Sequence, residues 1–245
     1  MSKHPFAKPG VTDNRAYRRL HHGAGLCYYG VSEGETDLHI GSERDMRKEA
    51  LAAAQEARRQ VVAAISGRPD FLTTLTPLLP AGEEPVALSM IQATSVCGVG
   101  PMAAVAGAIA AYVGTQLPGD LVVENGGDLF IRSAAPRIVA VYAGDSPFSE
   151  KLGVRVHAPE GCGVCTSAGR VGPSLSFGDA DAVMIVAPNA ALADACATAA
   201  GNRVQGENGL QAAVAFASGI PGIVGALAIR GEQMAAWGEM ELVRL

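Results

Sequence analysis

Apolar and polar residues alternate over two short stretches near the N-terminus, residues 25–32 and 35–40. Alternation with period two is typical of strands with one buried face, and the Gly-containing turn between the stretches favours a β-hairpin. The pattern then becomes helical over residues 43–65. Ser42, followed three residues later by Asp45, resembles a capping box, so we expect this helix to begin directly after the hairpin.

The rest of the chain changes between apolar runs of strand length and Ala-rich runs of helix length. Predicted strands cover residues 85–90, 120–127, 128–133, 137–143, 152–158, 181–187, 222–230 and 240–245. Predicted helices cover residues 101–113, 189–204 and 210–217. Strands in hairpins beside a few helices favour an α+β fold, in which helices cover antiparallel sheets. A doubly wound parallel fold is the weaker alternative, because the sequence has no dinucleotide-binding Gly-rich turn and no P-loop.

Composition indicates a globular chain with an unusual core. No linker divides the 245 residues, so we predict a single domain over residues 1–245, with residues 1–14 as a flexible tail. Hydrophobic residues make up 49% of the chain and charged residues 18%, which excludes a disordered protein. Aromatic residues contribute only 5%, whereas Ala is abundant and Gly reaches 30 residues. Small residues allow close backbone packing, and they also leave space for a ligand.

The charge pattern excludes two classes of partner. The net charge is −5 and no Lys/Arg cluster lies beside stacking aromatics, so we expect no nucleic-acid surface. Residues 96–113 are uncharged, but Ala and Gly dominate them, so we expect a buried helix and no membrane span. The N-terminus carries no apolar signal segment, and we therefore expect a cytoplasmic protein with reduced cysteines.

Three segments carry residues suited to chemistry. The first is Asn125, Gly126 and Gly127, which follow a strongly apolar predicted strand. Glycines there allow a sharp turn with exposed amides, which a phosphate or a flavin edge can approach. Asn-Gly is equally the signal of a plain hairpin turn, so both interpretations stay open.

The second segment contains Cys162 and Cys165, spaced as Cys-x-x-Cys. Such a pair can hold a metal ion or cycle as a dithiol, although a structural metal site needs two further ligands. Two small buried thiols without shared chemistry are the alternative. Thr166 and Ser167 follow directly and form a hydroxyl-rich stretch suited to hydrogen-bonding a polar ligand.

The third segment contains Asp194 and Thr198, four residues apart on a predicted helix. This spacing places both side chains on one helix face. A carboxylate and a hydroxyl are ligands that Mg²⁺ accepts when further oxygens complete the shell. An Asp with a nearby Thr is also common on partly exposed helices, where it binds nothing.

Taken in order, four segments resemble the ApbE-like superfamily, and in particular its UPF0280 branch. The resemblance extends over about residues 15–240. The segments are VGPMAAVAGAIAAYVG (99–114), ENGGDLF (124–130), CTSAGRVGPSLSFGDADAV (165–183) and ALADACATAA (191–200). ApbE proteins are Mg²⁺-dependent flavin transferases, which cleave FAD and attach FMN to a protein Ser or Thr. The resemblance therefore implies a T-fold-related α+β architecture and a flavin nucleotide ligand.

The resemblance also implies roles for individual residues. Asn125, Gly126 and Gly127 match the turn beside the flavin, Thr166 and Ser167 match the family's TSG segment, and Asp194 and Thr198 match the residues that hold Mg²⁺. Two departures stand out. The transferases' H-x-I-D-P segment has no counterpart here, and Pro173 stands where UPF0280 sequences usually carry His.

Two further hypotheses stay open beside nucleotide binding and FAD cleavage. UPF0280 proteins are associated with sulfur assimilation in anaerobes, through homocysteine formation, and Cys165 lies in the branch signature. Its thiolate would be the catalytic group and would carry sulfur as a persulfide. The last hypothesis is a non-catalytic scaffold that forms a homo-oligomer through the same turns.

Overall fold

The computed structural model describes residues 25–169 and 178–245, which form an antiparallel sheet covered by helices. The predicted α+β architecture is confirmed. The strands run in the order β1-β2-β3-β4-β5-β6-β7-β8, and β9 pairs with β5. Their bounds are β1 Cys27–Glu33, β2 Thr36–Ser42, β3 Leu121–Asn125, β4 Asp128–Ala140, β5 Leu152–Ser167, β6 Ala182–Ala187, β7 Gly225–Arg230, β8 Gln233–Gly238 and β9 Glu241–Arg244.

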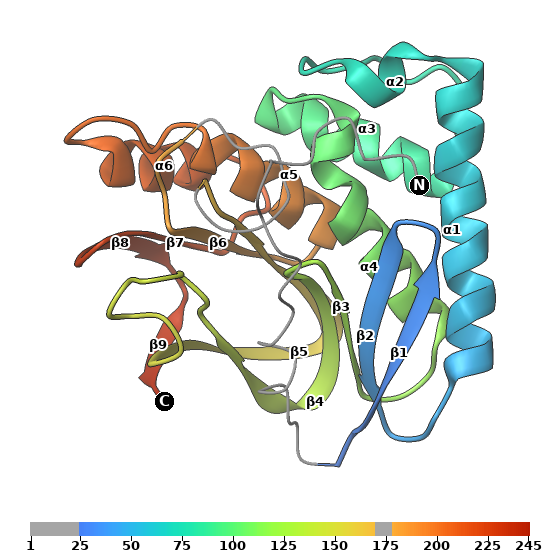
Figure 1. Cartoon of the computed structure of the whole chain (residues 1–245), viewed down its shortest axis with the longest axis horizontal. Coiled ribbons are helices and arrows are strands. Elements are labelled where there is room, and N and C mark those ends of the chain that lie inside the picture. The colour runs from blue at the N-terminus through green and yellow to red at the C-terminus, as the bar shows by residue number, and fades with distance from the viewer. Residues whose placement is uncertain (1–24, 170–177) are drawn as a thin grey trace.

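The helices lie on one side of this sheet. Their bounds are α1 Arg47–Gly67, α2 Asp70–Thr73, α3 Pro85–Cys97, the 3-10 helix η2 Pro101–Ala104, α4 Val105–Gln116, α5 Ala190–Gly201 and α6 Gly209–Ser218. Figure 1 shows α1 beside the β1–β2 hairpin and α5 and α6 over β6 and β7. Between helices and sheet lies the larger hydrophobic core, to which α5 contributes mostly Ala.

A second, smaller core fills the opposite face of the sheet. Its side chains come mainly from β4 to β7, with Ile131, Val154 and Leu227 almost fully buried. The long strand β5 holds the two parts together, because its first residues pair with β9 and its last residues pair with β6. Register shifts in β4 follow Ile131 and Ser133 and allow this strand to bend with its partner.

The strand predicted at residues 85–90 is wrong, because these residues begin α3. Pro85 occupies the first turn, where its missing N–H costs no hydrogen bond. The N–H of Val86 is satisfied from outside the helix, by Oε1 of Gln60 at 3.0 Å. Buried positions then recur with helical spacing to Cys97.

The helix predicted at residues 101–113 is confirmed as η2 followed by α4, but residues 96 and 97 belong to α3 and not to the same buried helix. The apolar run is interrupted at Gly98, whose φ of 74° is left-handed and ends α3, and η2 and α4 follow. Among the described residues, no single helix is both long and apolar enough to cross a membrane, although the bent pair Pro85–Cys97 and Pro101–Gln116, at 103°, passes by length and composition.

Smaller differences concern element boundaries. α1 begins after Met46 and not at residue 43, because the hydroxyl of Ser42 donates to the carbonyl of Arg44 instead of capping the helix. β8 was not predicted, since most of its residues are exposed and it lacks a clear alternation. The expected tail, residues 1–14, and the stretch around Pro173 lie outside the described residues.

Candidate functional site

Gly126 and Gly127 form the turn between β3 and β4, across which Asn125 pairs with Asp128. Their φ angles of 65° and 106° suit glycine, so the hairpin interpretation is confirmed. The Gly127 N–H donates to Oε1 of the buried Glu124 at 2.8 Å. A Cβ at Gly126 would meet no atom within 4 Å, so the turn has an open side. A ligand role for the turn stays a prediction.

Asn125 connects this turn to the first residues of α4. Its side chain is buried, and Nδ2 donates to the carbonyl of Ala106 at 3.2 Å. The turn therefore has a fixed position relative to the amino end of that helix.

Asp194, on α5, also hydrogen-bonds the start of α4. It lies on α5 with 8% of its surface exposed, and its Oδ2 accepts the N–H of Gly107 at 2.8 Å. The N–H of Ala106 also donates to this carboxylate. Amides in the first turn of a helix lack partners within the helix and favour a negative charge. These two hydrogen bonds lower the pKa of Asp194, but the loss of solvation on burial has a larger effect and raises this pKa to about 7.

The abundant small residues serve close packing here. A Cβ on Gly107 would lie 2.3 Å from the carbonyl oxygen of Ala190 and 2.8 Å from Cβ of Asp194. The backbones of α4 and α5 can approach this closely only because position 107 has no side chain. Thr198 lies one helical turn after Asp194, on the same face of α5, and is half-buried.

Asp128 is a site residue that the sequence did not single out. It has 8% of its surface exposed, and its Oδ1 accepts the N–H of Thr166 at 3.2 Å. Its carboxyl also shares a hydrogen bond with the thiol of Cys165. Burial raises the pKa of Asp128, and the negative charge of Asp194 raises it further. Strand register explains its position: Leu129 pairs with Val164, so Asp128 lies beside the end of β5.

Cys165 is fully buried between β4 and α5. Its thiol donates to the carbonyl of Ala190 at 3.4 Å. Burial, and then the charges of Asp128 and Asp194, raise the pKa of Cys165 well above its ordinary value. The side chain is therefore a thiol at neutral pH. Ser167, at the end of β5, is buried as well.

The Cys-x-x-Cys pair does not act as one group. Residues three apart on a strand point to opposite faces, and Cys162 and Cys165 accordingly belong to the two different cores. The hypothesis that they share a metal ion or a disulfide is wrong. The thiols that do meet are those of Cys97 on α3 and Cys196 on α5, which share a hydrogen bond.

Two of the predicted segments thus meet at the amino end of α4, where Asn125 and Asp194 hydrogen-bond its first residues. The end of β5 is held next to them, because Cys165 contacts Ala190 at the start of α5 and Thr166 donates to Asp128. Within residues 25–169 and 178–245, no three His, Cys, Asp or Glu side chains are arranged to hold a metal. A cation here would need hydroxyl, carbonyl or ligand oxygens as well. Carboxylate and hydroxyl oxygens are hard donors, so the residues present fit Mg²⁺.

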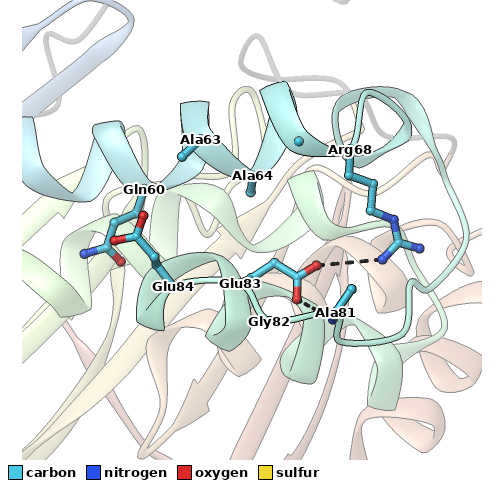
Figure 2. A pocket seen from close by; sticks show the side chains of 9 residues that line it. Gln60, Ala63, Ala64, Arg68, Ala81, Gly82, Glu83 and Glu84 are labelled. Atoms are coloured by element: carbon cyan, nitrogen blue, oxygen red, sulfur yellow. Dashed lines mark hydrogen bonds and ion pairs between the residues drawn. The ribbon is translucent and has the colours of Figure 1, made fainter.

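A separate hollow of about 250 Å³ lies between α1 and the segment that precedes α3. Figure 2 shows Arg68 and Glu83 facing each other across it, with Nη1 and Oε1 3.8 Å apart. Glu83 also accepts the N–H of Ala81 at 2.7 Å. None of the residues around the start of α4 lines this hollow.

A family model and curated relatives place the chain in the same family. A family model described as AbpE bacteria matches residues 18–218. A UPF0280 protein from Methanothrix thermoacetophila is 41% identical over 202 residues, 80% of this chain and 84% of that protein. A UPF0280 protein from Methanocella arvoryzae is 37% identical over 212 residues, 84% of this chain and 86% of that protein.

Solved structures of two flavin transferases have a fold similar to that of this chain. The apo flavinyl transferase ApbE from Pseudomonas stutzeri has a TM-score of 0.50 at 13% identity, over 86% of this chain and 93% of that one. The flavin transferase ApbE from Vibrio cholerae has a TM-score of 0.51 at 11% identity, over 86% of this chain and 96% of that one. At these identities the likeness establishes the α+β fold alone.

Proposed function

We propose that the chain, which belongs to the UPF0280 family of ApbE-like proteins, binds a flavin nucleotide such as FAD at the amino end of α4. One observation carries the proposal. Asn125, beside the Gly126–Gly127 turn, and Asp194 on α5 both hydrogen-bond the first residues of α4. The end of β5 is hydrogen-bonded to Asp128, on the other side of the same turn. Flavin transferases of the ApbE type share this fold, which supports the same ligand.

Each group would contribute a separate interaction. The open side of Gly126 allows the edge of a flat ring system to approach the main chain. The hydroxyls of Thr166 and Ser167 are suited to hydrogen-bonding polar atoms of the nucleotide. Asp194 and Thr198 would hold Mg²⁺, which when bound neutralises pyrophosphate charge.

The reaction class that this arrangement fits is cleavage of the FAD pyrophosphate. A water or protein hydroxyl would attack the phosphorus of the FMN half, and AMP would leave with the bond electrons. The chain's own task is positioning and electrostatic stabilisation, which dominate phosphoryl transfer. Whether FMN passes to water or to a protein hydroxyl distinguishes a pyrophosphatase from a transferase.

Titration calorimetry with FAD and Mg²⁺ tests the proposal. The wild-type chain should bind FAD, and Asn125→Ala should bind it roughly tenfold more weakly, since about 1.4 kcal/mol corresponds to a factor of ten. Asn208→Ala, which removes an exposed amide before α6, is the matched control and should bind as the wild type does. Absence of FAD binding by the wild type would contradict the proposal.

The sulfur-carrier role of Cys165 stays a prediction, as does the scaffold role. A persulfide forms from a reactive thiolate. Burial raises the pKa of Cys165 and its thiol is held by Ala190. The geometry therefore supports nucleotide binding better than it supports thiol chemistry.

A further inference from the structure

A fully buried acidic side chain lies next to the Gly126–Gly127 turn. Glu124, on β3, has none of its surface exposed, and its Oε1 accepts the N–H of Gly127 at 2.8 Å. Burying a carboxyl group is costly even when hydrogen bonds compensate part of the loss of solvation. A two-residue hairpin turn with glycines forms without such a side chain. The hairpin alone therefore does not explain an acidic residue at this position.

Glu124 holds the turn from the face of the sheet opposite to the one that Asn125 uses. Successive residues of a strand point to opposite faces. Glu124 pairs with Leu129, which belongs to the smaller core, whereas Asn125 bonds to Ala106 of α4 on the helical side. Hydrogen bonds therefore fix the turn from both faces of the sheet.

The hydrogen bond from Gly127 leaves Gly126 as the free backbone donor of the turn. Among the described residues, none accepts a hydrogen bond from the N–H of Gly126, and this position has open space where a Cβ would lie. An acidic group next to the turn disfavours an anion in front of it. The acceptor that suits the Gly126 N–H is therefore an uncharged oxygen or ring nitrogen, and not a phosphate.

We propose that Glu124 is a positioning residue of the nucleotide site, which fixes the turn so that the Gly126 N–H donates to an uncharged acceptor on the ring of the bound nucleotide. The inference rests on the proposed function for its ligand. Two consecutive glycines make a flexible turn, and ordering a flexible segment on binding costs affinity. A turn that Glu124 holds before the ligand arrives avoids that cost.

Titration calorimetry with FAD and Mg²⁺ on the full chain tests this role. Glu124→Ala should bind FAD roughly tenfold more weakly than the wild type, because the turn loses its hydrogen bond. Glu124→Gln should bind within about threefold of the wild type, because the amide oxygen can accept the same N–H. Wild-type affinity in Glu124→Ala, or a Glu124→Gln as weak as Glu124→Ala, would overturn the inference.

Asp120→Ala is the matched control. Asp120 directly precedes β3, at the end of the same hairpin that lies away from the turn, and its Oδ1 accepts the N–H of Ala134 at 3.0 Å. This variant also removes a carboxyl group that accepts a backbone N–H. It should bind FAD as the wild type does, and an equal loss of affinity in both alanine variants would show a general effect on the hairpin and overturn the positioning role.

Amide hydrogen exchange on the wild type alone keeps the inference testable if Glu124→Ala does not fold. In the free protein Gly127 should exchange slowly and Gly126 rapidly, and FAD should slow exchange at Gly126. Inorganic phosphate without nucleotide should leave both rates unchanged. Rapid exchange at Gly127 in the free protein, or slowing of Gly126 by phosphate, would overturn the inference.

The failure of this inference is distinguishable from the failure of the proposed function. A wild type that binds FAD, together with a Glu124→Ala that binds it equally well, supports nucleotide binding and overturns the role of Glu124. A wild type that binds no FAD contradicts nucleotide binding and overturns both.

Discussion

At the scale of single residues, the site depends on the absence of a side chain at Gly107. A methyl group on Gly107 would overlap the backbone of Ala190. Gly107→Ala should therefore lower the free energy of unfolding by about 1–3 kcal/mol, because two packed backbones must separate. Urea unfolding measures this. Gly67→Ala is the control: a Cβ there meets no atom within 4 Å, and its stability should match or slightly exceed that of the wild type. Equal stability of the two variants would contradict the close contact.

Asp194 should make stability depend on pH. Its pKa rises from 3.8 to about 7 on folding, chiefly through burial. Because the folded chain holds this proton more tightly, the stability gained is complete below about pH 4 and is lost as the pH rises to about 7. Asp128 shifts in the same direction. Without added metal, the wild type should lose unfolding free energy over this range relative to Asp194→Asn.

Urea unfolding of both proteins across this pH range provides the measurement. The exposed Asp145→Asn is the control and should follow the wild type at every pH. A stability difference between the wild type and Asp194→Asn that stays constant with pH would show that Asp194 is ionised throughout.

At the scale of elements, strand geometry decides the chemistry of the cysteines. Cys162 and Cys165 lie on opposite faces of β5, so mild oxidation of the folded chain should give no disulfide between them. Mass spectrometry of the oxidised, proteolysed protein tests this. Alkylation should first modify Cys27, which is exposed, and this provides the internal control for thiol access. A Cys162–Cys165 disulfide formed in the native state would contradict the register of β5.

Elements were predictable wherever local pattern and tertiary environment agree. The β1–β2 hairpin and β6 have clear apolar patterns, and the structure confirms them. Residues 85–90 were wrongly predicted as a strand, because a short apolar run fits a strand or a buried helix equally well. β8 was missed because its register comes from β7 and not from an alternation of its own.

At the scale of the whole molecule, the sheet order assembles the site. β3 and β4 carry the Gly126–Gly127 turn, β5 lies beside β4, and α5 packs on β5 and β6 against the start of α4. The segments themselves were recognisable in the sequence through family resemblance. Asp128 was not, because its contacts with Thr166 and Cys165 exist only once β4 and β5 pair in this register.

The whole-molecule arrangement also separates the proposed site from the hollow of Figure 2, which lies beside α1. We propose above that a flavin nucleotide binds at the start of α4. Titration of FAD and Mg²⁺ into the isotope-labelled chain, followed by amide chemical shifts, tests it most directly. Binding at the start of α4 should shift the amide resonances of Gly107, Gly126 and Thr166 and leave those of Gly67 and Gly82, in the hollow, unchanged. Shifts confined to Gly67 and Gly82, or no shifts at all, would contradict it.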